Sequence, residues 1–212
     1  MRIAQIAPLF ESVPPRLYGG TERVVSYLTE DLVRLGHEVT LFASGDSETR
    51  ARLVSGAPSA LRLSARVPQE AGIHVAMLRS VYAQRHRFDI LHFHVDDWHV
   101  REPRLLDLPH LTTMHGRLDL AEQLERFLPY QDELALASIS AAQRRPLPHA
   151  NWVGTVHHGL PLDLYKPRYE HGHYLAFLGR ISPEKRVDRA IDIAGQFGMP
   201  LKNRGQGRRP GP

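Results

Sequence analysis

The chain has 212 residues, of which 42% are hydrophobic and 24% are charged, and this balance favours a folded globular protein over a disordered one. It contains no cysteine, which excludes disulfides and thiolate metal sites. The formal net charge of +4 suits an anionic substrate or a peripheral contact with an anionic membrane, and no zinc spacing or basic helix indicates nucleic-acid binding. We expect a cytoplasmic protein, because the sequence contains no membrane-spanning apolar run and no signal peptide.

Strand and helix patterns alternate from the N-terminus onward. Short apolar runs predict buried strands at residues 3–7, 38–43, 89–95, 111–114, 136–139 and 151–156. Apolar residues at helical spacing predict helices at residues 21–35, 73–84 and 118–127. Thr21 is the expected N-cap of the first helix, whereas residues 50–72 have no clear pattern. The alternation predicts an α/β fold, with a Rossmann-like parallel sheet covered by helices on both faces.

A second α/β pattern follows a polar linker at residues 166–173. A strand is expected at residues 174–178, and Pro183 opens a helix that runs to about Phe197. The last ten residues are Gly, Arg, Pro and other polar residues without periodicity. We therefore expect an N-terminal domain, the beginning of a second domain and an irregular basic tail, at residues 1–165, 166–202 and 203–212.

Polar residues gather where the predicted strands end. In open parallel sheets, ligands bind outside the carboxyl ends of the strands. The residues expected to bind substrate along this edge are Gly19, Gly20, His94, Trp98, Gly116, Ser140 and His158. Gly19 and Gly20 precede a helix, so their backbone N–H groups can hold an anion or a sugar hydroxyl, although a loop that needs a flexible backbone explains them equally well.

Residues 92–99 are dense in polar groups for a strand end. His92, His94 and Asp96 share one face of an ideal strand. Three interpretations stay open: a sugar-binding edge whose carboxylates and imidazoles hold hydroxyls while Trp98 stacks on the sugar ring, a metal site, or polar packing beneath the helices. Since the spacing fixes no third metal ligand, we expect no metal.

Two further sets of residues carry possible chemistry. His115 follows a strand and can exchange a proton near neutral pH, although a single histidine is often structural. Arg180 and Lys185 flank the N-terminus of the late helix. They predict a diphosphate clamp, with a solvated basic turn as the alternative.

Taken together, these motifs resemble the retaining GT-B glycosyltransferases of family 4. The resemblance runs from residue 1 to about residue 202. It is carried by the first strand, the glycine loop, the second strand, the histidine motif Thr-Met-His-Gly, the end of the first domain and the start of the second, at residues 1–8, 18–25, 35–42, 113–116, 156–163 and 177–185. His158 departs from the family pattern, in which Asn is commoner.

The resemblance implies roles for particular residues. Gly19 and Gly20 would approach the donor phosphate or the acceptor, and His115 would contact the transferred sugar. Arg180 with Lys185 would hold the diphosphate of a nucleotide-sugar donor, and no other cofactor is implied. The family has a carboxylate pair further along its second domain, and this chain ends before such a pair. We therefore expect a transferase that is truncated in its nucleotide-binding domain.

Two other functions stay open. In a glycoside hydrolase, Asp96, Asp97 and Glu22 would supply the carboxyl groups, with His115 or His94 as proton carrier. In a catalytically inactive fragment or sugar-binding module, the unfinished second domain would leave a strand edge and an apolar helix face uncovered. A homo-oligomer would cover that surface.

Overall fold

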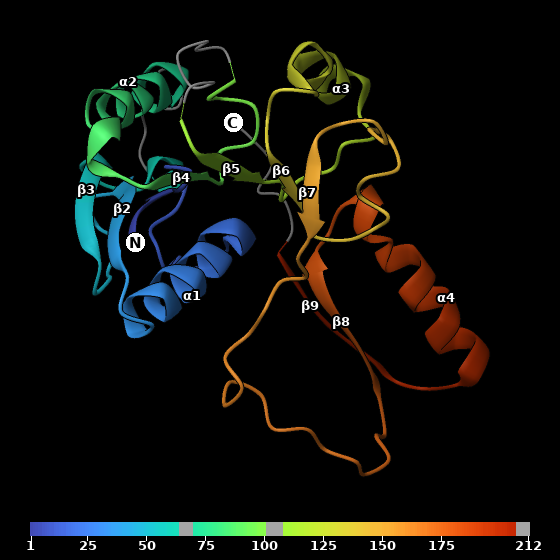
Figure 1. Cartoon of the computed structure of the whole chain (residues 1–212). Helices are drawn as coiled ribbons and strands as arrows, with labels where there is room; N and C mark the ends of the chain where they lie inside the picture. The colour runs from blue at the N-terminus through green and yellow to red at the C-terminus, as the bar shows by residue number, and fades with distance from the viewer. Residues whose placement is uncertain (64–69, 101–107, 207–212) are drawn as a thin grey trace. The chain divides into compact units, whose positions relative to one another are not determined.

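The computed structural model describes residues 1–63, 70–100 and 108–206. The chain divides into two compact units, Met1–Leu162 and Asp163–Pro212 (Figure 1). Among the described residues, no helix is long and apolar enough to cross a membrane.

The described part of the first unit contains a seven-stranded parallel sheet. Its strands are β1 Arg2–Ile6, β2 Glu38–Ser44, β3 Arg52–Ala57, β4 Ile90–Phe93, β5 His110–Thr113, β6 Leu136–Ser138 and β7 Trp152–Thr155. They lie in the order β3-β2-β1-β4-β5-β6-β7, and each neighbouring pair is parallel. The predicted Rossmann-like α/β fold is therefore confirmed.

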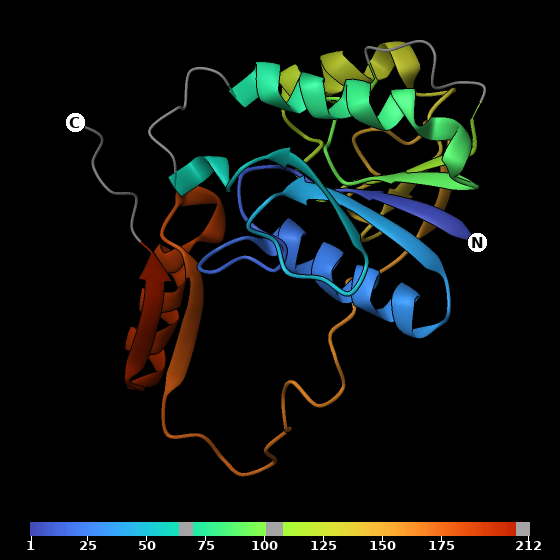
Figure 2. The same ribbon diagram turned by 90° about the vertical axis from the view of Figure 1, so that its left-hand side faces the viewer.

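Helices cover both faces of this sheet. The α-helices are α1 Gly20–Arg34, α2 Glu70–Ala83 and α3 Ala121–Phe127, and the 3-10 turns are η1 Leu61–Leu63, η3 Arg85–Arg87 and η5 Leu128–Tyr130. Helix α1 lies on one face, and α2 and α3 lie on the other (Figures 1 and 2). This arrangement explains why the central strands are apolar on both faces.

The core is divided by the sheet. Alternate residues of β1 and β4 pack with α2, and Phe42 in this cluster is fully buried with its ring edge-on to Phe88 at 5.9 Å. On the opposite face, Val25 of α1 packs against Leu41 of β2. A third cluster, which includes Phe127 of α3, lies around β6. Packing on both faces therefore fixes the positions of the strands, and with them the carboxyl ends of the strands at one edge of the sheet.

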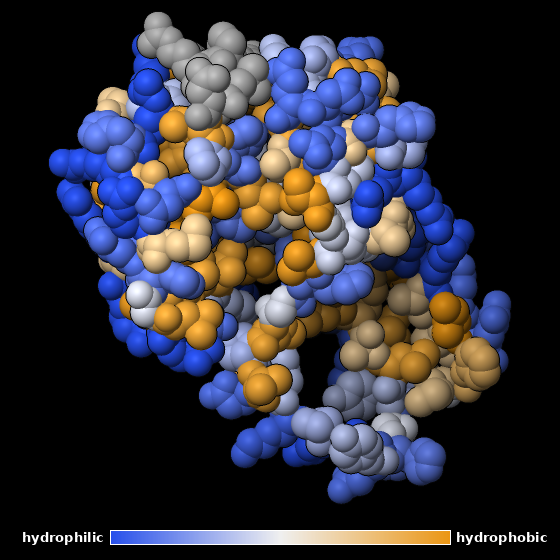
Figure 3. All heavy atoms as spheres, in the orientation of Figure 1, coloured by the Kyte–Doolittle hydropathy of each residue, from blue (hydrophilic) through white to orange (hydrophobic). Residues whose placement is uncertain are grey.

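The second unit holds β8 Leu175–Arg180, η6 Pro183–Lys185, α4 Val187–Phe197 and β9 Leu201–Gln206. Strands β8 and β9 pair in parallel. Apolar side chains lie at the surface over β8 and α4 (Figure 3), including Leu178 at 82% exposure and Phe197 at 72%.

Several predicted element boundaries are wrong. Strand β3 lies within the stretch that has no clear sequence pattern. Thr21 lies inside α1, whose N-cap is Gly19 without a side-chain hydrogen bond. The helix expected from Pro183 is interrupted at Arg186, which has a φ of 54°. Strand β9 continues to Gln206, so the first part of the expected irregular tail is a strand, and the rest of that tail lies outside the described residues.

Position 19 needs a glycine because a side chain would not fit there, and not because of its backbone conformation. Its φ of −175° is extended and open to any residue. A Cβ atom at Gly19 would lie 2.7 Å from Oε2 of Glu22 and 2.8 Å from Cβ of Pro15. A Cβ atom at Gly20 would meet nothing within 4 Å. The two adjacent glycines therefore have different structural roles.

This difference predicts opposite effects of two neighbouring substitutions. Gly19→Ala should lower the free energy of unfolding by about 1–3 kcal/mol, because the new methyl group overpacks the loop. Gly20→Ala is the matched control and should leave stability unchanged or raise it by up to about 1 kcal/mol, because the unfolded chain loses freedom. Urea unfolding measures both values. Equal midpoints for the two variants would show that the loop relaxes around the added methyl group.

Candidate functional site

The order in which strands are added to the sheet reverses at β1. Strands β2 and β3 extend the sheet to one side of β1, whereas β4 to β7 extend it to the other. The loops that follow β1 and β4 therefore leave a topological switch point, where open α/β sheets bind their ligands. Gly19 ends the first of these loops and Asp96 belongs to the second.

Four histidines form a cluster at this edge, and we refer to His92, His94, His115 and His158 as the histidine cluster. The rings of His92 and His94 on and after β4 lie 4.2 Å apart between centroids. The ring of His115, after β5, lies 5.1 Å from that of His94. It also stacks on His158 at 5.1 Å with an angle of 20°. Three of these residues were predicted as site residues, and the structure brings them together.

Hydrogen bonds connect the cluster to a buried amide. Gln5 of β1 is fully buried and lies beside His92 in the strand register. Its Oε1 lies 2.8 Å from Nε2 of His94, and its Nε2 lies 3.3 Å from Nδ1 of His92. His94 Nδ1 lies 2.8 Å from His115 Nε2, and His92 Nε2 lies 2.7 Å from Thr113 Oγ1. Sequence patterns did not point to Gln5, because a glutamine within an apolar strand has no distinctive spacing.

The remaining ring nitrogen of His115 has no hydrogen-bond partner among the described residues. Within the described part of the chain, His115 Nδ1 is buried and makes no hydrogen bond. A buried polar atom without a partner is uncommon in folded proteins and marks a position at which an added group would gain a hydrogen bond.

Burial keeps the histidine cluster neutral near pH 7. It lowers the pKa of His92 to about 4 and, with repulsion from His158 and His92, lowers the pKa of His115 to about 3. The pKa of His94 is held well below its usual value by burial and by the three neighbouring imidazoles. Burial also lowers the pKa of His158. These rings therefore act as neutral donors and acceptors rather than as cations.

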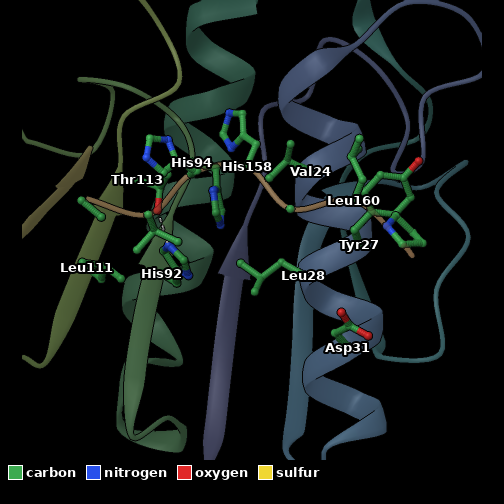
Figure 4. A pocket seen from close by; sticks show the side chains of 15 residues that line it. Val24, Tyr27, Leu28, Asp31, His92, His94, Leu111, Thr113, His158 and Leu160 are labelled. Atoms are coloured by element: carbon green, nitrogen blue, oxygen red, sulfur yellow. Dashed lines mark hydrogen bonds between the residues drawn. The ribbon is translucent and has the colours of Figure 1, made fainter. Parts of the chain in front are cut away.

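A pocket of about 270 Å³ lies beside the histidine cluster. Val24 and Leu28 of α1 form one wall, and the segment after β7, with His158 and Leu160, forms another. Figure 4 shows the side chains of His92 on β4, His94 directly after β4 and Thr113 on β5, on the side of the sheet that faces α1.

The predicted residues after β4 point to different places. Asp96 has a φ of 47°, and burial together with the neighbouring Asp97 raises its pKa to about 6. Asp97 is buried with Oδ2 at 3.4 Å from Nη1 of Arg126 on α3. The ring of Trp98 lies 4.6 Å from that of His74 and packs against the α2 core. The structure therefore does not bring Asp97 and Trp98 into the histidine cluster.

The loop that carries His115 is held by a side chain that sequence analysis missed. Gln143 donates from Nε2 to the carbonyl oxygens of Met114 at 3.0 Å and Gly116 at 2.8 Å. Ser140 accepts a hydrogen bond from the backbone N–H of Gln143 at 3.2 Å through its Oγ. In the structure, Ser140 thus supports the turn that delivers Gln143.

Glu22 lies beneath the glycine loop rather than with the other predicted carboxylates. Its side chain is buried near Gly19, and burial raises its pKa. The neighbouring charges that act on it belong to Glu11 and Arg62. Glu11 is also buried, burial raises its pKa, and its Oε1 lies 3.4 Å from Nε of Arg62. This acidic group therefore belongs to the packing of the loop.

The predicted phosphate-binding residues lie in the second unit. Arg180 ends β8 and its Nη2 lies 2.8 Å from Oε1 of Glu184. Lys185 lies in η6, before the start of α4. Within residues 1–63, 70–100 and 108–206, no group of three or more histidine or carboxylate side chains is arranged to hold a metal ion.

Three solved structures that share the fold are named as a glycosyltransferase, a sucrose-phosphate synthase and a glycotransferase. AviGT4, a glycosyltransferase involved in avilamycin A biosynthesis, matches with a TM-score of 0.66 and 23% identity over 99% of this chain and 58% of its own length. Sucrose-phosphate synthase from Thermosynechococcus elongatus matches with a TM-score of 0.61 and 14% identity, over 97% of this chain and 70% of its own length. The glycotransferase of kitacinnamycin matches with a TM-score of 0.51 and 16% identity, over 95% of this chain and 64% of its own length. This chain thus spans less than two thirds of AviGT4, and the TM-scores show that the matched chains share its fold.

No curated protein matches the chain in sequence. Residues 18–158 match the profile of Glycosyltransferase Family 4. This match covers more than half of the 212 residues and includes the glycine loop, the residues after β4 and the whole histidine cluster. The chain therefore belongs to Glycosyltransferase Family 4.

Proposed function

We propose that the first unit is the acceptor-side domain of a nucleotide-sugar-dependent glycosyltransferase and that the carboxyl edge of its sheet binds a hexose. Membership of the family supports transfer as the reaction class. Two of the similar structures are named as glycosyltransferase or glycotransferase, and a third is a sucrose-phosphate synthase. These names support a sugar as substrate.

The observation that carries this proposal is the Nδ1 atom of His115, which has no hydrogen-bond partner in the described part of the chain. The atom is buried at the carboxyl end of β5, and its ring is neutral near pH 7. A neutral imidazole nitrogen can form a hydrogen bond with a hydroxyl group, and sugars present hydroxyl groups in quantity. His158, stacked on the same ring, would then help to hold the ring plane against the bound sugar.

The second unit would hold the donor. Arg180 and Lys185 supply cationic groups that can bind a diphosphate. Arg180 is paired with Glu184 on an exposed surface, where such a pair contributes little, so an incoming diphosphate can replace the carboxylate. In the first unit, the open space around Gly20 would leave the first turn of α1 accessible to the acceptor or the donor phosphate.

A glycoside hydrolase is the second candidate, because Asp96 has the raised pKa that a general acid needs. Hydrolysis also requires a second carboxyl group on the opposite side of the glycosidic bond. Asp97 is paired with Arg126, and Glu22 belongs to the group beneath the glycine loop. Neither is arranged as that partner, so we favour transfer.

The two functions are separated by one set of assays on the 212-residue protein. Nitrophenyl glycosides are incubated with and without a panel of nucleotide sugars, and both nitrophenol release and sugar transfer are followed. We expect nucleotide-sugar binding or transfer. Nitrophenol release without nucleotide, lost in Asp96→Asn, would establish the hydrolase instead, and the absence of both activities together with the absence of nucleotide-sugar binding would refute the proposed transferase.

His115→Ala should abolish sugar binding or transfer while leaving the circular dichroism spectrum unchanged. The reason is that the substitution removes the free ring nitrogen at the end of a strand whose backbone is held by its neighbours. His86→Ala is the matched control, because His86 is exposed in η3, before β4 begins. Calorimetry with nucleotide sugars measures the loss. If the fold of His115→Ala collapsed, His115 would have a structural role, and unaltered binding would exclude it from the site.

Asp96→Asn should change how stability depends on pH. The folded-state pKa of Asp96, about 6, lies above the ordinary value of 3.8, so the folded protein binds this proton more tightly than the unfolded chain. The resulting stabilisation is present below pH 3.8 and is lost as the pH rises through about 6. Asparagine does not titrate and tolerates a positive φ.

We therefore expect Asp96→Asn to gain stability relative to the wild type between pH 4 and pH 7, by about 2–3 kcal/mol in the free energy of unfolding. Urea titrations at both pH values give the difference, and the measurement at pH 4 serves as the internal control. A difference that stays constant with pH would mean that Asp96 ionises as it does in the unfolded chain.

A further inference from the structure

The buried amide of Gln5 faces two different histidines. A carboxamide accepts hydrogen bonds through its oxygen and donates them through its nitrogen. In Gln5, Oε1 faces Nε2 of His94 at 2.8 Å and Nε2 faces Nδ1 of His92 at 3.3 Å. Gln5 is fully buried, so water does not compete for either end. The two ends of one side chain therefore impose opposite requirements on the two rings.

The requirement at Oε1 propagates to the edge of the sheet. Since Oε1 only accepts, His94 must carry its hydrogen on Nε2. The ring is neutral, because its pKa is lowered by burial, so its Nδ1 is an acceptor. His115 Nε2 lies 2.8 Å from that atom and must therefore donate to it. In a neutral His115, this leaves Nδ1 without a hydrogen.

We propose that Gln5 is a positioning residue that fixes the tautomers of His94 and His115, so that His115 presents a bare Nδ1 lone pair to a hydroxyl group of the bound sugar. The part that concerns the sugar rests on the proposed function. The part that concerns the tautomers rests on the hydrogen bonds of the unliganded protein alone.

The opposite direction of the network is less favourable. With the amide of Gln5 reversed, His94 would donate from Nδ1 to His115, and His115 would carry a hydrogen on Nδ1. That N–H group would be buried without an acceptor in the described part of the chain. Buried N–H groups without an acceptor are rarer than acceptors without a donor. The observed direction leaves only a lone pair unsatisfied.

The other end of the amide is satisfied in the same arrangement. Gln5 Nε2 donates to His92 Nδ1, and His92 then donates from Nε2 to Thr113 Oγ1 at 2.7 Å. The whole network is thus consistent with one hydrogen on Nε2 of each of these three rings. The bare Nδ1 of His115 selects groups that donate a hydrogen bond, such as hydroxyls, and repels groups that only accept, such as carboxylates.

The test is nitrogen-15 NMR of the unliganded protein labelled at histidine, which reports the tautomer of each ring without any need for activity. Signals are assigned by their loss in His94→Ala and His115→Ala. In the wild type, we expect His94 and His115 to be in the Nε2–H form, with slowly exchanging ring N–H protons. In Gln5→Leu, which removes both ends of the amide at similar volume, the Nδ1–H form should rise to a population comparable to the Nε2–H form in both rings.

Gln5→Glu is the matched control, because a carboxylate keeps the acceptor that His94 needs. It should leave His94 and His115 in the Nε2–H form and change His92 instead, whose Nδ1 loses its donor. The proposal is refuted if His115 carries Nδ1–H in the wild type, or if folded Gln5→Leu keeps the wild-type tautomers.

If Gln5→Leu does not fold, the wild-type and Gln5→Glu spectra still decide the question. Correct tautomers in a protein that binds no nucleotide sugar would refute the proposed function and leave the role of Gln5 intact. A sugar that binds without moving the Nδ1 resonance of His115 would refute the hydroxyl contact.

Discussion

The parallel pairing of β1 with both β2 and β4 is the constraint on which the rest of the structure depends. Because every strand of the sheet runs the same way, every loop that follows a strand emerges at one edge. At β1, the direction in which successive strands are added to the sheet reverses. The loops after β1 and β4 therefore lie on either side of this point, and α1 and α2 lie on opposite faces (Figures 1 and 2). The glycine loop, Asp96 and the histidine cluster are all products of this arrangement.

The interior next to this edge is polar where the strand pattern would place apolar side chains. Gln5, His92 and Thr113 all face α1 from adjacent strands, and their hydrogen bonds satisfy one another. Such a network is tolerated because nearly every member is paired and none is charged near neutral pH. The exception is Nδ1 of His115 at the end of the network, which is buried and has no partner among the described residues.

The sequence predicted the architecture well because most strands are apolar runs and most helices have an apolar stripe. Edge strands were harder, since β3 and the end of β9 are half-exposed or polar and carry no such run. At the site, His94 and His115 were predictable from their positions after strands. Gln5 and Gln143 were not, because the role of an amide depends on which partners the fold brings to it. Trp98 was expected to stack on a sugar ring, but the fold brings its ring against the α2 core.

The side chain of Gln143 couples the loop after β5 to the loop after β6. Its Nε2 binds the carbonyls on both sides of His115, while its Oε1 accepts from the backbone N–H of Ile139 at 2.9 Å. A displacement of the loop after β5 must therefore pull on the loop after β6, or break the two hydrogen bonds that Gln143 Nε2 donates. Protection of the Ile139 amide against hydrogen exchange should therefore rise and fall with the order of the His115 loop.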